Sequence, residues 1–399
     1  MSDWGQGSKN NNIGWGQGAV NNSISWGLSH SESWAGDTDI LGEVIDNRLI
    51  FSVKTDNAGT SATNQFTIPT TGTGYLYDIE TSDGQSTTGL TGGTTITFPS
   101  AGTYDVYISG SFPQFYFNNA GDRLKLINLK NFGIYAQGST SQVNAFYGCS
   151  NMVISATDIG HFENVTNFSF AWRGCSSLTS FPLLDTSSGT NFSFAWQGCN
   201  KLTSFPLLDT SSGTNFSSAW SDCTLLTSFP LIDTSLGTDF SAAWNRCSSL
   251  TSFPLIDTSS GTNFSNAWSV CSSLTSFSLI DTSNGTIFAY AWYGCSSLTS
   301  FPLLDTSLGT NFAYAWSDCS SLTSFPANAF DTNIASNYAS SFTSTKLSTQ
   351  SIDDILISLD ASGVINGTFN QSGGGNLPSA VGLAAKANLI SKGWTITTN

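Results

Sequence analysis

Cysteines divide this chain, from residue 149 onward, into intervals of nearly constant length. The eight of them lie at positions 149, 175, 199, 223, 247, 271, 295 and 319, so every interval after the first is 24 residues. A tryptophan precedes each of the last seven cysteines by three residues, and a leucine follows each of them by three. Self-similarity at this period predicts a solenoid, because so short a unit buries its apolar face only against neighbouring copies.

Each unit, written NFSxAWxxCSSLTSFPLIDTSSGT, predicts one short strand and one helical turn. In the segment 178–184, alternation places Phe181 and Leu183 on one face, and together with Leu178 they match the L-x-x-L-x-L spacing of leucine-rich repeats. In the segment 191–199 the apolar residues have helical spacing, which predicts an inward stripe. That stripe consists of Phe192, Ala195, Trp196 and Cys199. We expect a parallel sheet and short helices.

The pattern FxGCSSLTSFPLIDTSSGTNF resembles the BspA-like leucine-rich repeats of microbial surface proteins over roughly residues 140–345. The resemblance implies a curved solenoid that is used for adhesion. In this chain tryptophan stands where many relatives have Met-Phe, and the strand carries a Phe-Pro pair.

The outward face of the predicted strands is a candidate contact surface. Proline removes a backbone donor there, and a ridge of proline and aliphatic side chains can bind a ligand or partner. Self-association and packing against a neighbouring domain are the alternatives. The candidate residues are Ser180, Pro182, Leu184, Pro206, Leu208, Pro230, Ile232, Pro254, Ile256, Ile280, Pro302 and Leu304. A second set of positions around the predicted helix varies in residue type from repeat to repeat. These positions either face a partner or vary without a functional role. It comprises Arg173, Gln197, Ser221, Asn245, Ser269, Tyr293 and Ser317.

Two columns of side chains with reactive groups, one of cysteine and one of aspartate, are predicted to have structural roles. Stacked cysteines could form disulfides, but every inner cysteine has two equivalent neighbours, and C-x-x-C pairs for metal are missing from the sequence. We therefore expect buried thiols that act as small hydrophobes. The aspartates of the repeat suggest a calcium ladder or glycosidase carboxylates, yet six equivalent residues fit turn capping better. They are Asp185, Asp209, Asp233, Asp257, Asp281 and Asp305. We expect neither an enzyme nor a cofactor.

The N-terminal residues 1–38 form a region rich in Trp, Gly and Asn that predicts an extended anchoring peptide. Its candidate anchors are Trp4, Trp15, Trp26 and Trp34. A disordered leader is the alternative. The tandem WGQG motifs resemble the leader segments of tailed-phage virion and fibre proteins, which implies attachment to other virion proteins through residues 1–38.

Three further regions complete the predicted organisation. Residues 39–120 alternate apolar and polar positions in short runs, which predicts an all-β sandwich, and YDIETSDGQ with FPSAGTYDVYISG resembles PKD-like domains. The solenoid is expected over 121–345. Residues 346–399 predict an α/β C-terminal cap, with one helix capped by Ser351, a second helix over 379–392 and a final strand over 394–398.

Charge and composition exclude several partners. The chain has 27 acidic and 12 basic residues, a net charge of -15, which disfavours nucleic acid and anionic lipid. The N-terminus has neither a basic nor an apolar signal region, and a membrane span is not predicted. The first hypothesis is a phage virion structural protein, a tail or head fibre or surface decoration, assembled in the host cytoplasm. It would bind a host-surface glycan or protein, and a fibre implies a homo-oligomer such as a trimer. The alternative is a bacterial cell-surface adhesin.

Overall fold

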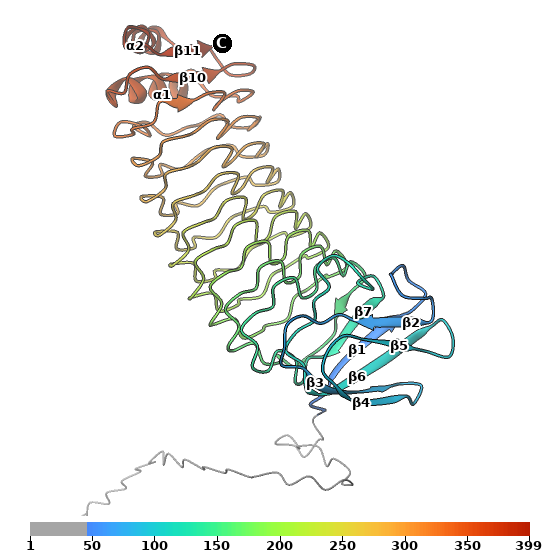
Figure 1. The fold of residues 1–399 in the computed structure, drawn as a ribbon. Helices are drawn as coiled ribbons and strands as arrows, with labels where there is room; N and C mark the ends of the chain where they lie inside the picture. The colour runs from blue at the N-terminus through green and yellow to red at the C-terminus, as the bar shows by residue number, and fades with distance from the viewer. Residues whose placement is uncertain (1–45) are drawn as a thin grey trace, which may run out of the picture. The chain divides into compact units, whose positions relative to one another are not determined.

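The computed structural model describes residues 46–399, which form one compact unit from Asp46 to Asn399. Figure 1 shows the strands β1–β7 at one end of this unit, a stack of coils, and the helices α1 and α2 at the other end.

The first part of the unit is built from antiparallel strands. A six-stranded sheet has the order β4-β3-β6-β1-β7-β8, and β2 pairs with β5 in a separate two-stranded sheet. Alternate residues of β3 (Leu76–Thr81) are buried and exposed, as expected for a strand with one face on a core. The other strands are β1 (Leu49–Lys54), β2 (Gln65–Ile68), β4 (Ser86–Leu90), β5 (Thr94–Thr97), β6 (Thr103–Ser111), β7 (Leu126–Asn131) and β8 (Val153–Ile154).

The sheet continues from this part into the first coils. Strand β1 pairs antiparallel with both β6 and β7, and β7 pairs parallel with β8 of the next coil. The buried Asp122, at the start of the first coil, accepts hydrogen bonds from the backbone N–H groups of Thr60, Ser61 and Thr67. Lys125 donates to the carbonyls of Ala62 and Gln65. These contacts tie the β1–β2 loop and strand β2 to the coil.

The inward stripe of each coil is confirmed, but its backbone is not helical. Phe192, Ala195, Trp196 and Cys199 are all fully buried. The residue between them, Phe194, has a φ of 59°, and the equivalent residue of every other coil is also left-handed. A left-handed residue in each turn prevents an α-helix. The backbone instead bonds to the next coil, as in the N–H of Phe192 to the carbonyl of Asn215 and the N–H of Trp196 to that of Ala219.

The segment of each coil that the sequence predicts as a strand has a different conformation. In segment 178–184 the buried residues are Leu178, Phe181 and Leu184, whereas Leu183 is 59% exposed. The buried positions therefore recur every three residues, the period of a polyproline II chain, rather than every two. Proline at 182 has a fixed φ and no N–H to join a ladder. Between coils this segment forms no continuous ladder: it has single backbone hydrogen bonds, such as that from the N–H of Thr203 to the carbonyl of Thr179, and the isolated bridge of Ser300 with Ser324.

Aromatic columns fill the solenoid. The seven tryptophans of the repeat are fully buried and stack at centroid distances of 5.4–5.7 Å. Each contacts the phenylalanine of its own coil edge to face, as Trp196 does Phe205 at 4.8 Å. All these side chains belong to one continuous core with the strands of the first part.

The last part of the unit closes the solenoid with two helices and a parallel sheet. Strand β10 (Thr368–Gln371) lies between β9 (Asn337–Tyr338) and β11 (Thr395–Thr398). Helix α1 (Thr349–Ala361) is capped by Ser348 rather than Ser351, and Ser379 caps α2 (Ala380–Ser391). Neither helix of residues 46–399 has the length and apolarity to cross a bilayer.

Candidate ligand-binding surface

The structure changes the composition of the outward ridge. The aliphatic residues predicted to be exposed are buried, because the three-residue period turns them into the core: Leu184, Leu208, Ile232, Ile256, Ile280 and Leu304. The neighbouring leucines are more than half exposed in their place: Leu183, Leu207, Leu231, Leu255, Leu279 and Leu303. Ser180 is exposed and the ridge prolines are partly exposed. The predicted anchors Trp4, Trp15, Trp26 and Trp34 lie outside the described residues.

The cysteine and aspartate columns are engaged within the fold. All eight cysteines are free and buried, and each of the last seven thiols donates to a carbonyl, as Cys247 does to Trp220 at 3.2 Å. Burial raises the pKa of the Cys247 thiol well above its ordinary value, so it is a poor nucleophile. Asp209 Oδ1 accepts from the backbone N–H and hydroxyl of Ser211. This is the turn that the sequence predicts.

The coils are closer together on one side than on the other. On one face the rings of Phe170 and Phe194 lie 4.7 Å apart, as do Tyr290 and Tyr314. Beyond the tryptophan column, Phe229 and Phe253 are 6.2 Å apart. Coils that diverge in this way make a curved stack, and the face with Phe194 and Tyr290 is concave.

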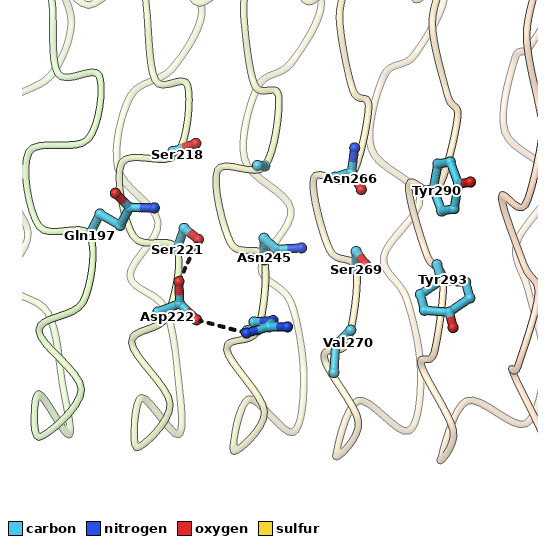
Figure 2. A pocket seen from close by; sticks show the side chains of 12 residues that line it. Gln197, Ser218, Ser221, Asp222, Asn245, Asn266, Ser269, Val270, Tyr290 and Tyr293 are labelled. Carbon is cyan, nitrogen blue, oxygen red and sulfur yellow. Dashed lines mark hydrogen bonds and ion pairs between the residues drawn. The ribbon is translucent and has the colours of Figure 1, made fainter.

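Three rows of side chains line a hollow on the concave face, across five successive coils (Figure 2). The upper row is Phe194, Ser218, Ala242, Asn266 and Tyr290. The middle row is Gln197, Ser221, Asn245, Ser269 and Tyr293. The lower row is Gly198, Asp222, Arg246, Val270 and Gly294. Except for Phe194, Gly198 and Gly294, all of these residues line the hollow, which has a volume of about 490 Å³ and is open to solvent.

The upper and lower rows stand on left-handed backbone. In the lower row Gly198 and Gly294 have φ of 75° and 68°, values that glycine adopts without strain. Asp222, Arg246 and Val270 have φ near 60° at the equivalent positions. Such a φ is costly for a side-chain-bearing residue, and most of all for a β-branched one such as Val270. Three adjacent coils thus carry side chains under the hollow at positions whose backbone conformation favours glycine.

Aromatic pairs stand at the two ends of the hollow. Phe170 and Phe194 are stacked within 8° of parallel, and Tyr290 and Tyr314 within 5°. The free face of Phe194 and the free face of Tyr290 are therefore turned toward the three coils between them. Those coils carry only small or polar side chains in the upper row.

Polar groups without protein partners line the hollow. Among the described residues, the side-chain amides of Asn245 and Asn266 make no hydrogen bond, and the buried Oε1 of Gln197 has no partner. Arg246 and Asp222 approach each other at 3.8 Å. The neighbouring Asp318 carboxylate raises the pKa of the Tyr293 hydroxyl above its ordinary value.

Sequence reasoning found the middle row but missed the upper and lower rows. It identified Gln197, Ser221, Asn245, Ser269 and Tyr293 as variable. The signal for the other rows was present, because the residues two before each tryptophan and one before each cysteine also change along the repeat. A helical backbone would also place these positions on one outward face, because 194, 197 and 198 are separated by three and four residues, so the three rows could have been grouped from the sequence.

The fold and this surface define a solenoid repeat protein with a uniform scaffold and a varied concave face. The chain belongs to the BspA-type leucine-rich repeat family, whose model matches six copies over residues 124–211 and 241–363, more than half of the chain. A solved leucine-rich repeat protein from Bacteroides ovatus ATCC 8483 is similar at 13% identity and a TM-score of 0.29, over 69% of this chain and 79% of that one. A search of curated proteins gives no match.

Proposed function

We propose that this chain is a surface-recognition protein of the bacterial adhesin type, which binds its partner on the concave face and catalyses no reaction. The observation that carries the proposal is the place where the coils differ. The buried Trp, Cys and Phe columns keep their residue from coil to coil, whereas the three rows around the hollow change. Repeats that share a scaffold and vary one face are suited to binding an extended partner.

Further observations support this function. Repeats of this family are typical of bacterial surface proteins. The repeated aspartates serve in turns rather than in a pair of unlike carboxylates, which favours binding over glycoside hydrolysis. We also infer that residues 39–120 are a PKD-like module that spaces the solenoid from its attachment, an inference supported by their antiparallel strands.

Binding of the labelled full chain to whole cells tests the proposed function. A panel of bacterial and animal epithelial cells is incubated with the wild type and with Ala242→Trp, which places a large ring in the middle of the hollow. We expect the wild type to bind one or more cell types and A242W to lose that binding. The matched control is Leu255→Trp on the outward ridge, which should bind like the wild type. Binding by A242W equal to that of the wild type would show that the recognition surface lies elsewhere on the protein.

A second candidate function is a phage virion structural protein, in a tail or head fibre. The observation that favours it is the tandem WGQG motif, with Trp4, Trp15 and Trp26 spaced by 11 residues. A cryo-EM map of the source particle tests it. Density for the solenoid, lost when residues 1–38 are deleted, would establish this candidate, and location on a cell envelope would exclude it.

A further inference from the structure

The geometry points to a neutral oligosaccharide as the ligand of the hollow, an inference that rests on the proposed binding function. The shape of the hollow favours this class of ligand. Phe194 and Tyr290 are four coils apart, and at a spacing of about 4.7 Å per coil the distance between them is about 19 Å. The hollow is open along this length and about 490 Å³ in volume. It suits a short chain of sugar rings rather than a single small molecule, which prefers an enclosed pocket.

The ring faces at the two ends supply the apolar contacts that a sugar needs. The flat side of a pyranose presents C–H bonds with partial positive charge, and the face of an aromatic ring is negative. Phe194 and Tyr290 each have one face covered by a stacked neighbour and the other face turned toward the hollow. Arg173 does not block Phe194, because its guanidinium is 5.3 and 5.4 Å from the centroids of Phe170 and Phe194 and so lies beside the pair.

Between the rings, the hollow offers hydrogen-bonding groups that the protein leaves unused. The amides of Asn245 and Asn266 each have donors and an acceptor without a partner among residues 46–399, and Gln197 Oε1 is a buried acceptor without one. Hydroxyl groups, which donate and accept, match such mixed groups. A buried acceptor is costly until a ligand satisfies it.

Charge and backbone pairing argue against other ligands. Among the residues that line the hollow Arg246 is the one cation, and Asp222 partly neutralises it. A second cation, Arg173, lies at one end beside the Phe170–Phe194 pair, so the centre of the hollow has little net positive charge to attract an anionic ligand. A peptide that adds a strand needs free backbone groups. On this face the N–H groups already bond between coils, as Phe194 does to Ser217 and Gly198 to Ser221. The neutral, hydroxyl-rich class of ligand remains the best match.

The test begins with the full chain on an array of oligosaccharides of one to six sugars, both neutral and sialylated. We expect binding to neutral chains of three or more sugars and little binding to single sugars. Calorimetry with the strongest neutral binder then compares variants. Tyr290→Ala and Phe194→Ala should each weaken binding about tenfold, the factor that 1.4 kcal/mol represents. Tyr290→Phe, which keeps the ring, and Leu255→Ala on the outward ridge should bind like the wild type.

Cell binding separates a failure of this inference from a failure of the proposed function. Cells that bind the chain are treated with periodate, which destroys sugar diols, or with protease. Binding that is lost after periodate but kept after protease supports a glycan as the ligand, including a glycan that the array does not contain. Binding that survives periodate but not protease leaves the proposed function intact and overturns the oligosaccharide, as does selective binding to sialylated probes. Absence of binding to both arrays and cells overturns both.

Discussion

The indole ring of Trp220 lies 5.6 Å from that of Trp244, centroid to centroid, with 7° between the ring planes. This pair is one step of a column in which every Nε1–H is buried without a hydrogen-bond partner among the described residues. An unsatisfied buried N–H costs about 1–3 kcal/mol. The column is nevertheless repeated seven times, so ring burial and stacking must outweigh this cost in each coil.

Replacing one inner ring should therefore be strongly destabilising. We expect Trp244→Ala to lower the free energy of unfolding by about 3–5 kcal/mol, the range for large core aromatics. Trp244→Phe should cost less, because it removes the unsatisfied N–H together with part of the ring. Urea denaturation measures both. The control Leu255→Ala, at a side chain that is 62% exposed, should change stability by about 0.5 kcal/mol or less. Equal effects at the two positions would contradict the role of the column.

The sequence predicts the repeat and most of its buried columns, because a fixed period reports directly which positions face the core. It does not predict the backbone that connects them. Alternation predicts Leu183 inside and Leu184 outside, and the reverse holds, because the buried positions of the segment recur every three residues. The coil that has Ser278 in place of proline follows the same pattern, so proline alone does not set this period. Apolar spacing cannot distinguish a helix from a chain of left-handed turns with the same inward residues.

The hollow could be predicted only in part for the same reason. Its middle row follows from variation along the repeat. The upper and lower rows lie three residues before and one residue after it, positions that a helix would also place on its outward face. The left-handed φ of residues such as Asn266 and Val270 is not encoded by a glycine signal. Curvature, which makes this face concave, arises from unequal spacing of columns and is not visible in any single repeat.

Strain under the hollow gives a second prediction. Val270→Gly should raise the free energy of unfolding by about 1 kcal/mol, because a left-handed φ costs a β-branched residue more than glycine loses in chain entropy. The reciprocal change Gly198→Val should lower it, since the added Cβ lies at the same strained φ. Chemical denaturation of the two variants decides the sign. A loss of stability in V270G would show that packing of the valine outweighs its backbone strain.

The buried thiols predict a fall in stability at alkaline pH. Burial raises the pKa of Cys247 well above that of an unfolded thiol, near 8.5. Above that pH the unfolded chain loses thiol protons that the folded chain keeps. The free energy of unfolding therefore falls by about 1.4 kcal/mol per pH unit for each such thiol, and below pH 8.5 the contribution is fully present. Between pH 9.5 and 10.5, Cys247→Ala should show a slope smaller than the wild type by this amount. Identical slopes would mean that the thiol ionises in the folded state.

The last prediction concerns the junction at Asp122. Burial alone raises the pKa of this carboxyl, but hydrogen bonds from Ser61 and Thr67, together with the charge of Lys125, outweigh it, and the pKa is lowered. Its contribution to stability is thus present above the unfolded pKa near 3.9 and is lost as pH falls through the lower folded value. We expect Asp122→Asn to cost about 3 kcal/mol at pH 7, as for other buried charges that lose their partner.

Two measurements locate that effect at the junction. Hydrogen exchange should show the amides of Thr60, Ser61 and Thr67 losing protection in D122N, because each donates to Asp122. Urea denaturation should show the stability gap between the wild type and D122N narrowing below pH 4, because the unfolded carboxyl takes up a proton there while the native carboxylate remains ionised. The control Asp209→Asn, at a repeat turn, should leave these amides protected. Unchanged protection in D122N would mean that the β1–β2 loop is held to the coil by β1–β7 pairing without the carboxylate.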